Sequence, residues 1–223
     1  MIQTLFQHDD FTIVNKPAGL SCHNDNDSLI HQLGKGWHLV NRIDRETSGL
    51  VVVTQKADLQ NQIQLALTQG KKLYSAILRG NMPRQSEGLP NEQTPGLWNE
   101  WAYPISDQGE GRETPQGKVE DQKESKTLYT VVQSNSYFTA VHCQLITGRQ
   151  HQIRKHSRLA GRPILGDPRY GNAKDNERIS KLYDFHRMAL HSWKLELVWK
   201  GDSISCESPV PESFAQLFTT MPA

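Results

Sequence analysis

The chain has 223 residues, with 25 Lys and Arg against 24 Asp and Glu, and 36% of its residues are hydrophobic. This length suffices for one domain or for two small lobes, because single domains reach about 250 residues. No apolar run approaches the roughly 18 residues of a membrane helix, and the N-terminus lacks the basic and apolar regions of a signal peptide. The cysteines form no C-x-x-C pair, so the composition predicts a cytoplasmic protein without a disulfide framework or a Cys-rich zinc site.

The net charge of +1 hides an uneven distribution of charged residues. Residues 147–171 hold six Lys or Arg against one Asp, a net charge of +5, whereas residues 81–126 hold five basic and nine acidic residues, a net charge of −4. A basic cluster of this kind favours contact with a phosphate backbone, although a solvated helix face would have the same composition. The near-neutral total therefore does not exclude a nucleic-acid-binding protein.

Hydrophobic periodicity and turn residues predict the elements of the first part of the chain. They indicate, in order, a strand at 11–15, a buried strand at 50–54, an amphipathic helix over 57–69 and a strand at 72–79. Residues 81–126 show no sustained periodicity and hold many Gly and Pro residues. We expect this acidic stretch to be a variable, loop-rich segment with short strands near 101–105.

The second part of the chain begins with a predicted hairpin over 128–132 and 137–146. A helix over 148–160 follows, and Thr147 and Gln150 at its start fit a capping box. A strand over 188–199 and a short amphipathic helix after Pro211 complete the pattern. Strands in runs, not strictly interleaved with helices, predict an α+β fold with a mixed, mostly antiparallel sheet.

Two constellations of polar residues can carry chemistry. Residues 41–49 (Asn-Arg-Ile-Asp-Arg-Glu-Thr-Ser-Gly) place charged side chains directly before the buried strand, an arrangement that also fits a salt-bridged corner. On the predicted helix, Arg154 and Arg158 share a face with His151, and such Arg side chains pair bidentately with carboxylates or phosphates. His151 and His156 are five residues apart, which does not predict a metal site.

The stretch 41–49 resembles the His-Arg-Leu-Asp-x-x-Thr-Ser-Gly signature of the RNA pseudouridine synthases of the large-subunit ribosomal RNA and tRNA type. Asn41 stands where the family has His, and Ile43 where it has Leu. Four further segments are similar to the family's motifs in the same order, namely Val-Asn-Lys-Pro-Ala-Gly-Leu at 14–20, Lys-Leu-Tyr-Ser-Ala at 72–76, the Thr-Gly-Arg to Gly-Asp block at 147–167 and Arg-Met-Ala-Leu-His at 187–191. The resemblance covers nearly the whole chain.

The resemblance implies a catalytic fold with two lobes, flanking helices and a central cleft. It implies one catalytic domain over 1–223, with no separate N-terminal RNA-binding module. The implied activity is the isomerisation of specific uridines to pseudouridine in rRNA or tRNA, without metal or organic cofactor. The implied partner is a structured RNA with a flippable loop uridine, bound by a monomer that does not associate with membranes.

Carried over position by position, the resemblance makes Asp44 the catalytic carboxylate, acting either as nucleophile or as base. Tyr74 would stack on the uracil and take the proton from C5. Arg154 would pair with Asp44 and keep it ionised, and Arg42 would fill the gap that the flipped uridine leaves. Contacts to RNA phosphates are expected from the remaining basic residues of the cluster, Arg149, Lys155, Arg158 and Arg162.

Two other functions compete with this interpretation. A non-catalytic RNA-binding or ribosome-assembly factor would keep the cleft without needing Asp44. A hydrolase that cuts the glycosidic bond with one carboxylate would release free uracil. The change to Asn41 removes any role that the usual His plays through ionisation, although an Asn side chain still forms hydrogen bonds.

Overall fold

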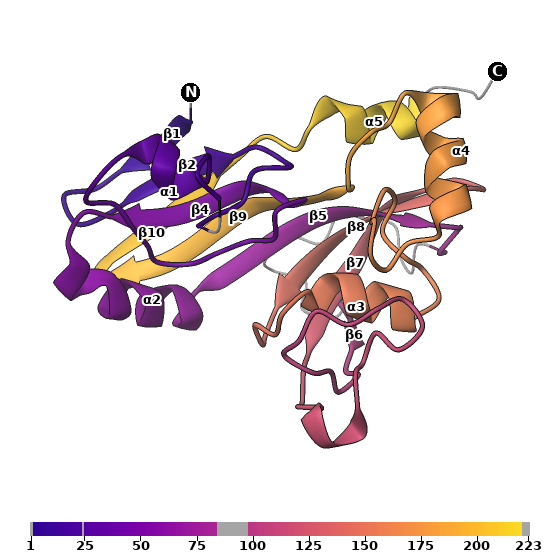
Figure 1. Cartoon of the computed structure of the whole chain (residues 1–223), viewed down its shortest axis with the longest axis horizontal. Helices are drawn as coiled ribbons and strands as arrows, with labels where there is room; N and C mark the ends of the chain where they lie inside the picture. Colours follow the sequence, from indigo (N-terminus) through magenta and orange to yellow (C-terminus); the bar gives the residue numbers. More distant parts are fainter. Residues whose placement is uncertain (1, 24, 84–97, 220–223) are drawn as a thin grey trace. The chain divides into compact units, whose positions relative to one another are not determined.

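The computed structural model describes residues 2–23, 25–83 and 98–219, and the chain divides into two compact units (Figure 1). Unit 1 comprises Met1–Tyr74 and Leu190–Val210, and unit 2 comprises Ser75–Ala189 and Pro211–Ala223. Each unit is therefore assembled from two separate stretches of sequence. Among the described residues, no helix has the length and apolar character needed to cross a membrane.

Unit 1 is built on strands in the order β1-β2-β4-β9, with β3 beside β4 and β10 beside β9. These strands are β1 (Gln3–Gln7), β2 (Thr12–Lys16), β3 (His38–Leu39), β4 (Ser48–Thr54), β9 (Leu190–Trp199) and β10 (Asp202–Glu207). All these pairs are antiparallel except β4 with β9, which run parallel. β4 is buried along its whole length, as its continuous apolar sequence predicts.

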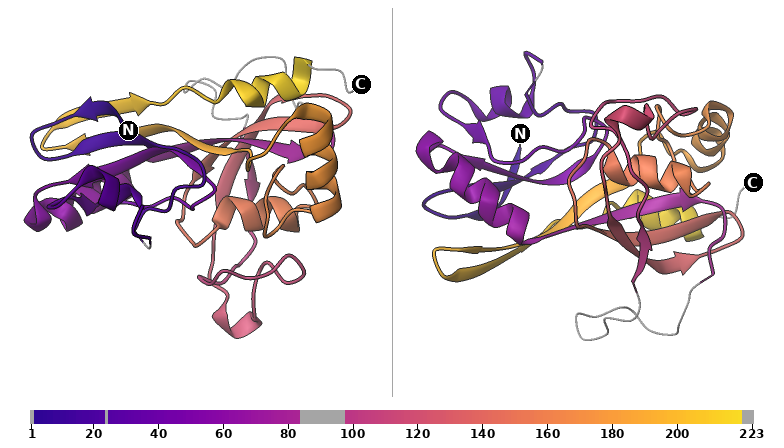
Figure 2. Two further views of the ribbon diagram at one scale, coloured as in Figure 1. Left: turned by 45° about the horizontal axis from the view of Figure 1, so that its top comes forward. Right: turned by 90° about the horizontal axis from the view of Figure 1, so that it is seen from below.

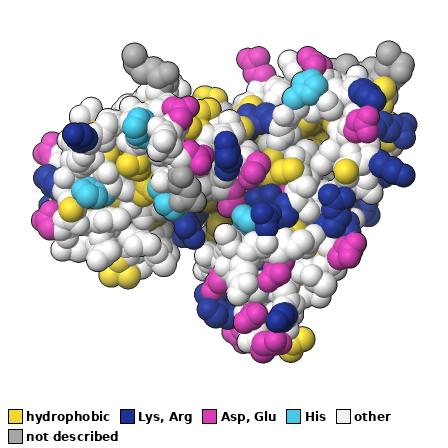
Figure 3. All heavy atoms as spheres, viewed as in Figure 1, with side chains coloured by type: hydrophobic (Ala, Val, Ile, Leu, Met, Phe, Trp, Pro, Cys, Tyr) yellow, Lys and Arg dark blue, Asp and Glu magenta, His cyan; other side chains and the backbone are white. Residues whose placement is uncertain are grey.

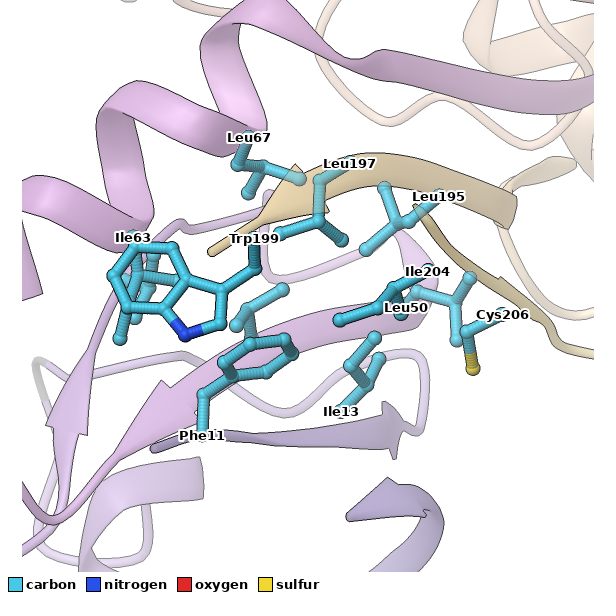
Figure 4. Packing of buried hydrophobic residues seen from close by; sticks show 12 residues of the cluster. Phe11, Ile13, Leu50, Ile63, Leu67, Leu195, Leu197, Trp199, Ile204 and Cys206 are labelled. Carbon is cyan, nitrogen blue, oxygen red and sulfur yellow. The ribbon is translucent and has the colours of Figure 1, made fainter. Parts of the chain in front are cut away.

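The helices of unit 1 are α1 (Leu29–Leu33) and α2 (Gln60–Gln69), the latter preceded by one 3₁₀ turn at Ala57–Leu59. The helix predicted over 57–69 is therefore confirmed. Ile63 and Leu67 of α2 are fully buried against Leu197 and Trp199 of β9 (Figure 4). This cluster extends to Leu50 of β4, so the strand that follows the signature is anchored in the core.

Unit 2 contains strands in the order β5-β8-β7-β6, where β5 begins in unit 1. The strands are β5 (Lys71–Arg79), β6 (Asn99–Trp101), β7 (Thr127–Ser134) and β8 (Phe138–Leu145). β7 and β8 form the predicted antiparallel hairpin. The helices α3 (Gln152–Leu159) and α5 (Glu212–Thr219) lie on opposite sides of these strands (Figure 2). A 3₁₀ turn at Val119–Asp121 and α4 (Ala173–Tyr183) complete the unit.

The start of α3 corrects the predicted helix over 148–160. The helix begins at Gln152, and His151 before it has a left-handed backbone (φ 56°). The reaching side chain is Gln152 and not Gln150, because Gln152 Oε1 accepts from the Arg149 N–H (3.0 Å) and the Thr147 hydroxyl (2.7 Å). The capping box was therefore placed wrongly, and His151 does not belong to the helical face of Arg154.

The helix α4 was not predicted from the sequence. Its sequence is mostly polar and only Ile179 is buried, so it has no clear apolar stripe. One local signal was present, because the Asn172 side chain caps the helix by accepting from the N–H groups of Lys174 and Asp175 (3.0 and 3.4 Å).

Candidate active site

Asp44 is half-buried in a tight turn that leads into β4. The turn is closed by the Thr47 N–H, which donates to the Asp44 carbonyl oxygen (3.1 Å). The loop after β2 supports the turn, since the Gly19 N–H donates to the Arg45 carbonyl (2.8 Å) and Arg45 Nε donates to the Gly19 carbonyl (2.9 Å). The backbone that carries Asp44 is thus held by a hydrogen bond within the turn and by two hydrogen bonds to the loop after β2.

Lys16 explains the Asn-Lys-Pro motif that precedes this loop. Its side chain is fully buried, and Nζ donates to the carbonyl oxygens of Pro17 (2.9 Å), Leu20 (2.7 Å) and Arg45 (3.1 Å). Burial of an ammonium group is unfavourable unless hydrogen bonds replace its hydration. The three carbonyl groups supply this replacement, so Lys16 ties the loop after β2 to the Asp44 turn.

The Ser-Gly end of the signature fixes β4 against β9. Ser48 Oγ lies 2.7 Å from Nδ1 of His191, and both side chains are buried. Gly49 has φ of 109°, and a Cβ added there would overlap the backbone carbonyl of Ser192. Only glycine allows this approach at such a backbone angle. The late Leu-His motif thus meets the signature inside unit 1, a contact that sequence reasoning missed.

Tyr74 lies near Asp44 within unit 1. Its side chain is buried, and burial is the main reason that the pKa of its phenol lies well above the usual 10. The negative charge of Asp44 raises this pKa further, whereas the nearby Ser192 hydroxyl opposes the shift. Because one group's charge perturbs the other's ionisation, the carboxylate and the phenol belong to one electrostatic site. At neutral pH the phenol is protonated.

Two neighbours complete the surroundings of the signature. Asn41 Oδ1 accepts from the Val52 N–H (2.7 Å), so the residue that replaces the family's His supports the backbone of β4. The buried Cys22 thiol donates to the Ile43 carbonyl (3.3 Å), and burial raises the pKa of this thiol. Asn41 thus holds the backbone of β4 and Cys22 holds the backbone next to Asp44, and neither role was predicted.

Arg154 is buried in α3 of unit 2, where it forms a bidentate pair with Asp167. Arg154 Nε and Nη2 donate to the two carboxylate oxygens at 2.8 and 2.9 Å. Burial by itself would raise the pKa of Asp167, but the hydrogen bonds and charge of Arg154 outweigh it and hold this pKa below its usual value. Asp167 lies at the end of the 147–167 motif, and no role was predicted for it. The pairing of Arg154 with Asp44 stays a prediction.

Lys155 does not fit the phosphate contact predicted for it. The residue is fully buried, and Nζ donates to the carbonyl oxygens of Ser106 (2.8 Å) and Gln108 (2.7 Å). An ammonium group turned inward in this way is shielded from RNA phosphates. Its position gives it a structural role, in which it fastens α3 to the acidic segment. Helix periodicity alone could not show this, because the carbonyl acceptors are more than 40 residues away in sequence.

The other predicted RNA-binding residues lie at the surface. Arg42 is exposed, whereas Arg149, Arg158 and Arg162 are half-buried. Arg149 Nη1 lies 3.5 Å from an Asp107 carboxylate oxygen, and Arg158 Nε donates to the Arg112 carbonyl (3.2 Å). The acidic segment therefore contacts the basic cluster at both residues and supplies an opposite charge at Arg149. Their contact with RNA stays a prediction.

The histidines of the α3 region hold local structure. His151 Nδ1 lies 2.9 Å from the Tyr170 hydroxyl. His156 is fully buried between Ser125, Thr127 and the Tyr103 carbonyl, and burial lowers its pKa to about 4. Within the described ranges, no group of three His, Cys, Asp or Glu side chains is placed to hold a metal ion.

Residues 10–159 match the family described as RNA pseudouridylate synthase. The chain belongs to this family. Ribosomal large subunit pseudouridine synthase D of Nitrosomonas europaea is 30% identical over 97% of this chain, which spans 64% of that relative. The tRNA pseudouridine synthase C of Vibrio parahaemolyticus is 26% identical over 98% of this chain and 94% of its own length.

The fold of this RNA pseudouridylate synthase family member is also similar to that of a solved structure. The human RNA pseudouridylate synthase domain containing 4 has a TM-score of 0.74 and 23% identity, covering 99% of this chain and 94% of that protein. The α+β fold with a mostly antiparallel sheet, predicted from the sequence, is confirmed.

Proposed function

We propose that this protein is an RNA pseudouridine synthase that isomerises uridines in rRNA or tRNA, with Asp44 as its catalytic carboxylate. The observation that carries the proposal is the half-buried Asp44, held in a braced turn and electrostatically coupled to the buried Tyr74. A carboxylate near RNA phosphates would weaken simple binding, because like charges repel. A binding factor has no use for it, whereas an isomerase needs it.

The reaction breaks the N1–C1′ bond of uridine, turns the uracil, forms a C5–C1′ bond and removes the proton from C5. The Asp44 carboxylate serves either as a nucleophile or as the base that forms a glycal. Tyr74 stacks on the uracil. As the resemblance implies, Tyr74 also takes the proton from C5. Because its raised pKa keeps the phenol protonated at neutral pH, the phenol gives up its own proton in this step, and N1, which has lost its bond to C1′, is protonated.

The remaining roles follow the family resemblance. We propose that Arg154 pairs with Asp44 and that Arg42 takes the place of the flipped uridine in its stack. Phosphates would be contacted by Arg149, Arg158 and Arg162. Lys155 is buried and does not contribute a phosphate contact. The protein acts as a monomeric, cytoplasmic enzyme, with residues 1–223 forming one catalytic domain.

Release of tritium from C5-labelled uridine in bacterial rRNA and tRNA tests the proposal. We expect Asp44→Asn to lower the rate by about 10³-fold or more, as removal of an essential catalytic group does. Asp58→Asn is the matched control, because Asp58 is an exposed carboxylate of the same unit. An Asp44→Asn protein as active as the wild type would refute the mechanism.

The products separate the competing functions. Free uracil among them would favour a hydrolase. RNA binding without tritium release, in rRNA and tRNA alike, would favour a non-catalytic factor.

A further inference from the structure

Unit 2 contains a cavity of about 300 Å³ between the turn of the β7–β8 hairpin and α4. This volume is at the lower end of small-molecule binding sites, which span about 300–1,000 Å³. The described lining residues belong to none of the five family motifs. The residues that matter for its chemistry are Arg79, Tyr137, Phe138, Asp175, Arg178 and Tyr183.

One wall of the cavity is a packed aromatic cluster with an exposed ring at its edge. The Phe138 ring lies edge-on to Tyr183 (centroids 5.3 Å apart) and to Phe218 (6.4 Å), so its position is fixed on two sides. The Tyr137 ring lies 6.2 Å from Phe138, yet Tyr137 is 59% exposed. The packed rings hold the wall in place, and the exposed Tyr137 ring provides an aromatic face on which another ring can stack.

The polar part of the lining carries a net positive charge. Arg79 forms an ion pair with Asp175, and Arg178 on the same helix as Asp175 adds a second guanidinium group. Burial raises the pKa of Tyr183, and the charge of Arg178 acts against this shift, so Arg178 lies near the phenol. Figure 3 shows Lys and Arg side chains gathered over α4, at the upper right of the molecule. The cavity therefore suits an anionic ligand.

We propose that this cavity binds an unpaired nucleotide of the RNA substrate, with the base stacked on Tyr137 and a phosphate paired with Arg178. Proteins recognise unpaired RNA with this pair of features, an aromatic face for the base and a guanidinium group for the backbone. The proposal rests on the proposed function only in taking RNA as the ligand. It adds an RNA contact that none of the five motifs supplies.

Binding of a short fluorescein-labelled oligouridine, followed by fluorescence anisotropy, tests the site in the full chain. We expect Tyr137→Ala to weaken binding by about tenfold, since stacking on one base has an effect of this size. Arg178→Ala should weaken binding. It should also make the slope of the logarithm of the binding constant against the logarithm of the salt concentration shallower by about 0.7. Both side chains are exposed, so neither change disturbs the core.

Two variants serve as controls. Tyr137→Phe keeps the ring and should bind like the wild type. Lys181→Ala removes a cation of the same helix that pairs with Glu177 (2.7 Å) outside the lining, and it should have little effect. Unchanged affinity of Tyr137→Ala would overturn the inference, as would equal losses in Lys181→Ala and Arg178→Ala.

Tritium release separates this inference from the proposed catalysis. With saturating RNA, the Tyr137→Ala protein should keep the wild-type rate while its KM rises. If the wild type releases no tritium but Tyr137→Ala still binds oligouridine tenfold more weakly, the nucleotide site stands and the catalytic proposal falls. If release is normal and oligouridine affinity is unchanged, the catalytic proposal stands and the nucleotide site falls.

Discussion

Gly49→Ala is the sharpest test of how the signature supports the turn that carries Asp44. Gly49 directly follows Ser48 and pairs with Ser192 in the parallel contact between β4 and β9. Its φ of 109° lies in the region that favours glycine, and an added Cβ would overlap the Ser192 carbonyl group. The substitution therefore adds one methyl group at a place where both the backbone angle and the space oppose it.

The magnitude follows from two separate costs. A non-glycine residue with a left-handed backbone costs about 1–2 kcal/mol. Forcing an extra carbon into packed structure costs about 1–3 kcal/mol more, because the obstacle is backbone that cannot rotate away. We expect Gly49→Ala to lower the free energy of unfolding by about 2–5 kcal/mol.

Gly19→Ala is the matched control in the same unit. Gly19 also has a positive φ (85°), but no atom lies within 4 Å of its added Cβ, so only the backbone cost applies. Urea unfolding followed by circular dichroism should give a loss of about 1–2 kcal/mol for this variant. If Gly49→Ala is no less stable than Gly19→Ala, the close approach of β4 and β9 does not constrain this position and the reasoning fails.

Three further predictions concern buried charges and Tyr74. Asp167→Asn leaves the Arg154 guanidinium buried without its counter-charge and should lower the free energy of unfolding by about 3–5 kcal/mol, measured with urea; a loss below about 1 kcal/mol would contradict this. Two Lys ammonium groups are the largest causes that hold the pKa of the buried Asp10 well below its ordinary 3.8, so the stability it contributes is present above about pH 4 and lost as the pH falls further; Asp10→Asn should flatten the acid side of the stability curve, and an unchanged curve would refute the linkage. Because the pKa of the Tyr74 phenol is raised, the rate of tritium release should show no change attributable to its ionisation up to about pH 10, and a step near pH 10 that Tyr74→Phe abolishes would contradict the raised pKa.

Local pattern was enough to predict much of the secondary structure. The continuous apolar run of β4 and the helical spacing of apolar residues in α2 can both be recognised within a short stretch of sequence. Both elements lie where these patterns predict them. The start of α3 and the whole of α4 were not predicted correctly. The side chain of Gln152 accepts hydrogen bonds from the turn before α3, and the residue spacing of a capping box does not predict this turn's geometry. The helix α4 buries only Ile179, so it has no apolar pattern from which to predict it.

The sequence by itself determined the family, the order of its motifs and the choice of Asp44, because these depend on which residues occur and in what order. Only the tertiary structure decided which charged side chains are structural. Lysine is usually found at the surface, yet Lys16 and Lys155 are both fully buried. Their ammonium groups donate to backbone carbonyls, several of them from distant parts of the chain. Because every residue carries a backbone carbonyl, the sequence does not show which of them accept these hydrogen bonds.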